Sequence, residues 1–143
     1  MPVRRFVSLL SLVMALSLLG GAAYAFAGAC QNVDFAVKND SGAKIRALKI
    51  EYKTKQDGKW RTEQIPNVEV PNGQKVQVAE NQSLQYIEGH DMTNLKLHYQ
   101  QWCGSAGWSK TFTYTDSDLA DPRCNSNSGK SYRVDLPAVD HCH

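Results

Sequence analysis

The sequence predicts an all-β protein: a small antiparallel β-sandwich of about eight short strands with two disulfides. Three observations predict this fold. Apolar and polar residues alternate over short runs, turn-forming residues separate the runs, and the four cysteines form an even set. Because 143 residues correspond to about one domain, we expect residues 28–143 to form a single β-sandwich domain.

Two runs alternate most clearly. Residues 33–38 (Val-Asp-Phe-Ala-Val-Lys) and 95–100 (Leu-Lys-Leu-His-Tyr-Gln) each place apolar side chains on one face of an extended strand. Residues 39–42 (Asn-Asp-Ser-Gly) follow the first run and have the composition of a turn. In the next segment, Ile45 and Ala47 share one face, whereas Leu48, Ile50 and Tyr52 have the opposite parity. This change predicts a β-bulge near Ala47.

Further short strands are expected along the rest of the chain. Pro66 and Pro71 bracket one at residues 68–70. The others are centred on Val76 and Val78, on Leu84 and Tyr86, on Phe112 and Tyr114, and on Tyr132, Val134 and Leu136. The expected core consists of Val33, Phe35, Val37, Ile50, Tyr52, Val76, Val78, Leu95, Leu97, Tyr99, Phe112, Tyr132 and Val134.

Residues 1–27 have the pattern of a secretory signal peptide. Arg4 and Arg5 precede an apolar stretch at residues 6–19, which is shorter than the ~20 residues of a membrane span. Small residues then allow cleavage after Ala25 or Ala27. We therefore expect a secreted or periplasmic protein. A lipoprotein signal that ends before Cys30 is the minor alternative.

The charge balance excludes one class of partner. Removal of the two arginines within residues 1–27 leaves basic and acidic residues in equal number. A nucleic-acid-binding protein usually carries a basic excess, because neutralisation of phosphates drives its affinity. We therefore expect no nucleic-acid partner. No second apolar run approaches the length of a membrane span, so we also expect no transmembrane segment in the mature chain.

The four cysteines are Cys30, Cys103, Cys124 and Cys142. An even number of cysteines in a small exported chain indicates disulfides, and four cysteines allow three pairings. We favour Cys30–Cys142, which would fasten the two ends of the domain, together with the local pair Cys103–Cys124. A zinc site is disfavoured, because no Cys-x-x-Cys spacing occurs.

Two segments are candidates for ligand binding. Seven lysines and arginines lie between residues 44 and 61 against only two acids, and among them we select Arg46, Lys49 and Arg61. The alternative is an ordinary solvated sheet face whose lysines discourage edge pairing. The second segment is the small-residue loop between Trp102 and Trp108, whose indoles suit sugars or a membrane interface. Its alternative is that the indoles cap the core.

Metal and catalytic chemistry have weaker support. The acids Asp116, Asp118 and Asp121 lack the glycine and distal glutamate of an EF-hand loop, and His141 and His143 lie in a tail expected to fray. The sequence leaves metal binding by either segment undecided, and we assign neither a metal nor a cofactor. The chain contains no Gly-x-Ser-x-Gly, His-Glu-x-x-His or phosphate-loop motif, so we expect no enzymatic activity.

The sequence therefore favours a secreted or periplasmic, non-catalytic binding domain. Its expected ligand is an anionic surface, such as a lipid, a glycan or an acidic protein. The first alternative is a protein-directed inhibitor or interaction module that uses a disulfide-held loop. A hydrolase with a dispersed site is the third class, because catalytic residues can come from distant parts of a chain.

Overall fold

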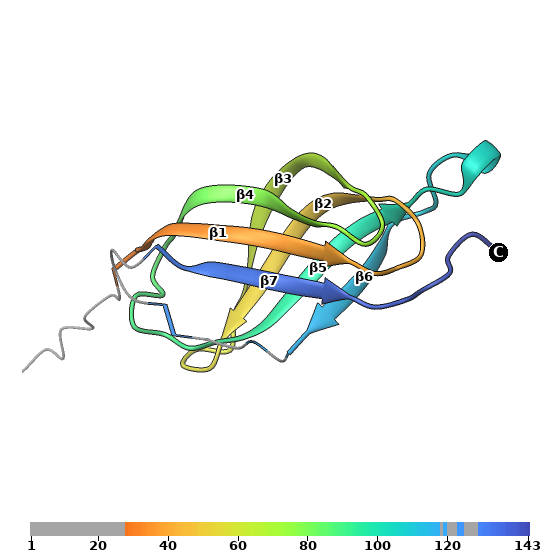
Figure 1. Ribbon diagram of the computed structural model, residues 1–143. Helices are drawn as coiled ribbons and strands as arrows, with labels where there is room; N and C mark the ends of the chain where they lie inside the picture. The colour runs from red at the N-terminus through yellow and green to blue at the C-terminus, as the bar shows by residue number, and fades with distance from the viewer. Residues whose placement is uncertain (1–27, 118, 120–122, 125–128) are drawn as a thin grey trace, which may run out of the picture.

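Two β-sheets lie face to face in the computed structural model, which describes residues 28–117, 119, 123–124 and 129–143 (Figure 1). The signal peptide expected at residues 1–27 lies outside these residues. The three-stranded sheet has the order β4 (Lys75–Leu84), β1 (Cys30–Asn39) and β7 (Ser131–Leu136). The four-stranded sheet has the order β3 (Trp60–Val70), β2 (Ile45–Thr54), β5 (Met92–Gln101) and β6 (Phe112–Asp116). The predicted all-β sandwich is confirmed.

Two details differ from the prediction. Strands β1 and β7 pair in parallel, whereas the other ladders are antiparallel. The described residues form seven strands, because residues 68–70 continue β3 instead of forming a strand of their own, and Leu84 ends β4. Strand β3 accommodates Pro66 because it lies at the edge of its sheet, where a missing N–H costs no ladder bond. Asn67 follows with a φ of 52°, which fits an irregularity in the strand.

The predicted bulge in β2 is confirmed. The register of β2 shifts between Ala47 and Lys49 against both of its neighbours, β3 and β5. Between Ala47 and Lys49, β2 contains one residue more than β5 does. Because of this extra residue, Ile45 and Ala47 are buried before the bulge, and Ile50 and Tyr52 are buried after it. All four side chains therefore face the core, and the residues between them face solvent.

The core lies between the two sheets. Phe35 of β1 packs against Tyr52 of β2 and Tyr132 of β7, with ring centroids 6.2 and 6.0 Å away. Of the predicted core residues, Val76 and Phe112 are only half-buried, and the others are buried. The prediction missed these buried apolar residues: Ala36, Ile45, Ala47, Ile65, Val70, Ala79, Leu84, Ile87, Met92 and Leu136. Full burial of a Val, Leu, Ile or Met side chain contributes roughly 1.5–3 kcal/mol.

The disulfides join Cys30 to Cys124 and Cys103 to Cys142, so the predicted pairing is wrong. The reason is the parallel pairing of β1 and β7. Because the two strands run in the same direction, the start of β1 and the end of β7 lie at opposite ends of the sandwich (Figure 1). Cys30 therefore pairs with Cys124, which precedes β7. Because the Cys30 sulfur is in this disulfide, it is not available for the lipid anchor of the lipoprotein alternative. All four cysteines are oxidised, as expected.

The predicted turn at residues 39–42 depends on one buried amide. Asn39 is fully buried, and its Nδ2 donates to the carbonyl oxygens of Ala43 at 2.9 Å and Val70 at 2.8 Å. Its Oδ1 accepts from the backbone N–H of Ser41 at 3.0 Å. The side chain thus connects the β1–β2 turn to the end of β3.

No helix among the described residues is long and apolar enough to cross a membrane.

We predict that Asn39→Ala lowers the free energy of unfolding by about 2–4 kcal/mol, because it leaves buried backbone groups without partners. Urea unfolding followed by tryptophan fluorescence measures the change. The control is Asn72→Ala, since the exposed Asn72 side chain accepts a single bond from Gly42 N–H at 2.8 Å. A loss of less than about 1 kcal/mol is expected for the control, and equal losses in the two variants would contradict the role of Asn39.

Candidate functional site

The solvent side of the four-stranded sheet gathers most of the basic segment. Because Ile45, Ala47, Ile50 and Tyr52 face the core, the alternate residues of β2 face outward. This outer surface, which we call the basic face, carries five cations: Lys44, Arg46, Lys49, Lys53 and Lys96. Two carboxylates oppose them, Glu51 and Glu69.

Two tryptophans lie at one end of the basic face. Trp102 and Trp108 form an antiparallel bridge, and their rings meet edge to face with centroids 5.2 Å apart. The Lys44 ammonium lies 5.3 Å from the centroid of each ring, and the Arg46 guanidinium lies 4.1 Å from that of Trp108. Glu69 pairs with both cations, at 2.8 Å from Lys44 and 3.6 Å from Arg46. We call these four cationic and aromatic residues the loop-end cluster.

The third tryptophan lies at the opposite end of the same face. Trp60 begins β3 and is paired with Lys53 of β2. The Lys96 ammonium lies 3.7 Å from the Trp60 ring centroid, and that of Lys53 lies 5.2 Å away. We call Trp60, Lys53 and Lys96 the hairpin-end cluster. Sequence reasoning missed Trp60 and Lys96 as site residues, although Lys96 occupies a polar position in the clearest alternating strand.

Glu51 organises the middle of the face. His98 Nε2 donates to its Oε2 at 2.7 Å, and the Thr113 hydroxyl lies 3.1 Å from His98 Nδ1. Lys49 also contacts Glu51, at 3.4 Å. The His98 hydrogen bond, followed by the interactions with Lys49, lowers the pKa of the Glu51 carboxyl. The face therefore presents a hydrogen-bonded polar centre between its two clusters.

The order carboxylate, imidazole, hydroxyl in Glu51, His98 and Thr113 is the one that a hydrolase triad uses. A triad also works in a site that excludes water and holds the substrate. None of these three residues lines the pocket described below. The bond to Glu51 fixes the orientation of the His98 ring, whose side chain is 16% exposed.

Arg61 does not belong to the basic face. It pairs across the ladder with the buried Tyr52, so its side chain has the inward parity. Arg61 instead binds the Asp57 carboxylate in the β2–β3 turn through two nitrogens. This hydrogen bond, together with those from Lys59 N–H and the Thr54 hydroxyl, holds the pKa of Asp57 well below its usual range. Of the three basic residues selected from the sequence, the structure brings only Arg46 and Lys49 to one surface.

The loop between Trp102 and Trp108 extends beyond the sheets (Figure 1). A short 3-10 turn, η1 (Gly104–Ala106), forms its tip and buries no side chain. Cys103 N–H donates to the Gly107 carbonyl at 2.8 Å, and the Cys103–Cys142 disulfide ties the loop to the C-terminal tail. Trp102 stays 40% exposed, so it does not cap the core. The loop is thus a constrained projection beside the loop-end cluster.

The C-terminal tail is held in place, so the expectation of a fraying terminus is wrong for His141. The imidazole of His141 stacks on Phe112 with centroids 3.5 Å apart, and its Nε2 lies 2.8 Å from the Tyr99 hydroxyl. Gln101 binds the tail backbone through both of its side-chain polar atoms. These contacts occupy the imidazole that sequence reasoning considered for a metal.

The described residues contain no group of three or more His, Cys, Asp or Glu side chains placed to hold a metal ion. Asp116 ends β6, and its Oδ2 accepts from Asp135 N–H at 3.1 Å. The other two acids considered for calcium, Asp118 and Asp121, lie outside the described residues.

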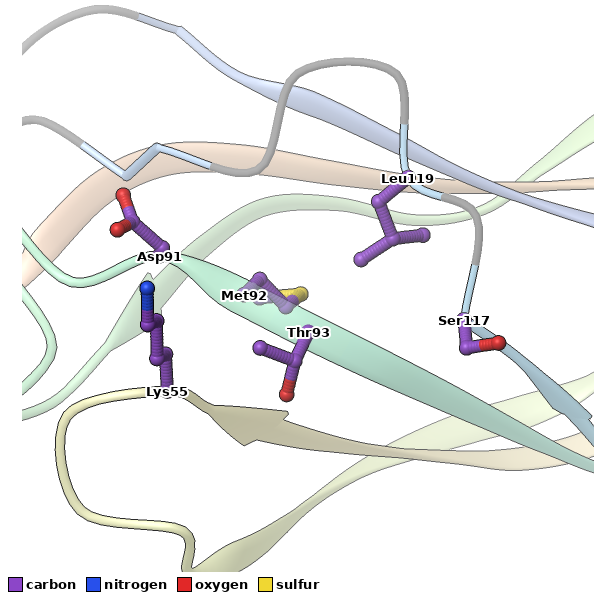
Figure 2. Close-up of a pocket in the computed structure, with 6 residues that line it drawn as sticks. All are labelled: Lys55, Asp91, Met92, Thr93, Ser117 and Leu119. Atoms are coloured by element: carbon purple, nitrogen blue, oxygen red, sulfur yellow. The ribbon is translucent and has the colours of Figure 1, made fainter.

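A pocket of about 310 Å³ opens at the end of the four-stranded sheet that is remote from the loop. Figure 2 shows the side chains of Lys55 and Asp91 on one side of it and those of Ser117 and Leu119 on the other. Met92 and Thr93, at the start of β5, lie between them. Ser117 and Leu119 flank a residue that is not described, so we assign no chemistry to this pocket.

No family model, curated protein or solved structure matches the chain. The charge and geometry of the basic face are therefore the basis for a functional assignment.

We predict that Asp57→Asn lowers stability at neutral pH by about 1–2 kcal/mol, because it removes the charge-assisted bonds to Arg61. Since the folded-state pKa of Asp57 is depressed, its contribution is present above the unfolded value of about 3.9 and is lost as the pH falls through the folded value. The difference between the two proteins should therefore shrink below about pH 4.

Thermal unfolding between pH 2 and pH 7 tests this prediction. Asp40→Asn serves as the control, because exposed Asp40 makes a surface ion pair with Lys38. A stability change of less than about 1 kcal/mol is expected there. A constant difference between Asp57→Asn and the unmodified protein across the whole pH range would contradict the assignment.

Proposed function

We propose that this protein is an exported, non-catalytic binding domain that recognises an anionic polymer or surface through the basic face. One observation carries the proposal. The chain has three tryptophans, and all of them lie on this one face, each with a cation over its ring. A merely solvated sheet face requires lysines but gives no reason to collect every tryptophan beside them.

The arrangement presents its charges in a form suited to binding. Stacking on indoles restricts long side chains before a ligand arrives, which lowers the entropic cost of association. The Lys44 and Arg46 side chains remain 38% and 30% exposed. Their exposed pairs with Glu69 are of the weak kind, worth about 0–1 kcal/mol, which an incoming anion can replace.

Export is supported by two independent features. Both disulfides suit an oxidising compartment, because thiols stay reduced in most cytoplasms. Residues 1–27 have the order of a signal peptide: basic residues, an apolar stretch and small residues. A secreted or periplasmic location also places the basic face where acidic glycans, anionic lipids and acidic proteins are accessible.

We predict that the disulfide-bonded protein binds immobilised heparin at low salt and elutes as the salt concentration rises. Each cation near an anionic surface contributes about 1 kcal/mol, so Lys44→Gln with Arg46→Gln should weaken binding about 10–30-fold. A salt series by surface plasmon resonance measures both effects, because screening weakens contacts between exposed charges.

The matched control removes the same charge from the other sheet, by Lys75→Gln with Arg133→Gln on β4 and β7. Its affinity should change less than about twofold, since these cations lie on a different surface. Binding that ignores salt, or equal losses in both double variants, would refute the proposal. Assays of ester, peptide and glycoside hydrolysis test the non-catalytic part, and turnover abolished by His98→Gln would overturn it.

One observation favours a second candidate, a protein-directed interaction module. The Cys103–Cys142 disulfide and the Trp102–Trp108 pair constrain the projecting loop tip. Because the tip buries no side chain, its rigidity adds little to the stability of the core. A rigid tip of small residues can enter a narrow cleft of another protein. If purified exported hydrolases are inhibited, the neutral, bulkier Ser105→Gln at the tip should abolish inhibition and leave heparin binding unchanged. Inhibition that survives this substitution would exclude the loop as the interaction site.

A further inference from the structure

The two clusters of the basic face lie at opposite ends of one strand. Arg46 of the loop-end cluster and Lys53 of the hairpin-end cluster are both on β2. A strand rises about 3.3 Å per residue, so these cations are separated by roughly 20 Å along the strand. Their spacing is fixed, because the strand between them pairs with neighbours on both sides.

The surface between the clusters is mainly polar, and the half-buried Leu48 in the bulge is its aliphatic residue. Across the central rows of the sheet, the outward residues are Thr62 and Gln64 of β3, Lys49 and Glu51 of β2, Lys96 and His98 of β5, and Thr113 and Thr115 of β6. Hydroxyl, amide and imidazole groups of this kind exchange hydrogen bonds with the hydroxyl groups of a sugar. The large exposed apolar side chains of the described residues are Trp60, Trp102 and Tyr86, with no aliphatic residue among them.

This composition distinguishes between two sources of negative charge. A lipid bilayer favours proteins whose exposed apolar side chains enter the acyl boundary, whereas the basic face offers charge, indoles and one half-buried aliphatic side chain, Leu48. A polysaccharide can use all three features: anionic groups meet the cations, hydroxyl groups meet the polar centre, and sugar rings meet exposed indole surface.

We propose that the ligand is a linear acidic polysaccharide that lies along β2 and engages both clusters at the same time. This inference rests on the proposed function of the basic face. The loop-end cluster is held by the Cys103–Cys142 disulfide, and the hairpin-end cluster is held by the β2–β3 ladder. Because neither cluster has to be ordered on binding, the second contact follows the first at high effective concentration.

The experiment is a length series of heparin-derived oligosaccharides, titrated by isothermal calorimetry at one ionic strength. Affinity should rise slowly with length and then increase about tenfold or more once a chain spans roughly 20 Å. Lys53→Gln with Lys96→Gln should remove this step, and so should Lys44→Gln with Arg46→Gln. The control Lys75→Gln with Arg133→Gln should keep it. Circular dichroism melting confirms that each variant is folded.

The outcomes separate the two proposals. If no oligosaccharide or long polymer binds in a salt-sensitive manner, the proposed function itself fails. If binding occurs with no step in length, or if only one cluster affects long chains, the two-cluster inference is overturned while the proposed function stands. Vesicles of phosphatidylglycerol and phosphatidylcholine, and single-stranded DNA of matched charge, complete the series. Equal or tighter binding of either one overturns the assignment to a polysaccharide.

Discussion

The bulge in β2 is the constraint on which the surface of this domain depends. A regular strand of this sequence would direct either Ile45 and Ala47 or Ile50 and Tyr52 into solvent. One extra residue lets both pairs enter the core and, at the same time, leaves Arg46 and Lys49 on the same outer face. The apolar packing that stabilises the sandwich and the alignment of its cations thus have one local cause.

The parallel pairing of β1 and β7 has an equally wide effect. It places the start of the domain and its C-terminal tail at opposite ends, and so decides which cysteines meet. It also places the tail beside the Trp102–Trp108 loop. There Gln101 and Tyr99 form hydrogen bonds with the tail, and Phe112 stacks on its His141. The direction of β7 places the tail next to the loop, and the Cys103–Cys142 disulfide then links the two segments.

Alternation was sufficient to predict the all-β class, the first and fifth strands and the bulge near Ala47, because these features are local. The same local signals failed for cysteine pairing, since the direction of β7 relative to β1 depends on contacts distant in sequence. The continuous β3 was missed because proline normally ends a strand, and only an edge position makes Pro66 tolerable. For the candidate site, the density of basic residues in the sequence identified Arg46 and Lys49. Which side of the sheet a residue faces depends on strand pairing, and this pairing excludes Arg61 from the basic face and adds Trp60 and Lys96 to it.

The two cross-links differ in their surroundings, and this difference gives the domain a graded response to thiols. Both sulfur-bearing residues of one bridge, Cys30 and Cys124, are sealed inside the sandwich, whereas Cys103 and Cys142 are partly open to solvent. A reductant such as glutathione therefore reaches the outer bridge while the inner one is still protected by the folded sheets. The product keeps its β-architecture and the contacts of His141 and Gln101 that hold the tail, but its loop loses the covalent link to Cys142. A mildly reducing environment would therefore loosen one tip of the molecule and leave the two sheets intact.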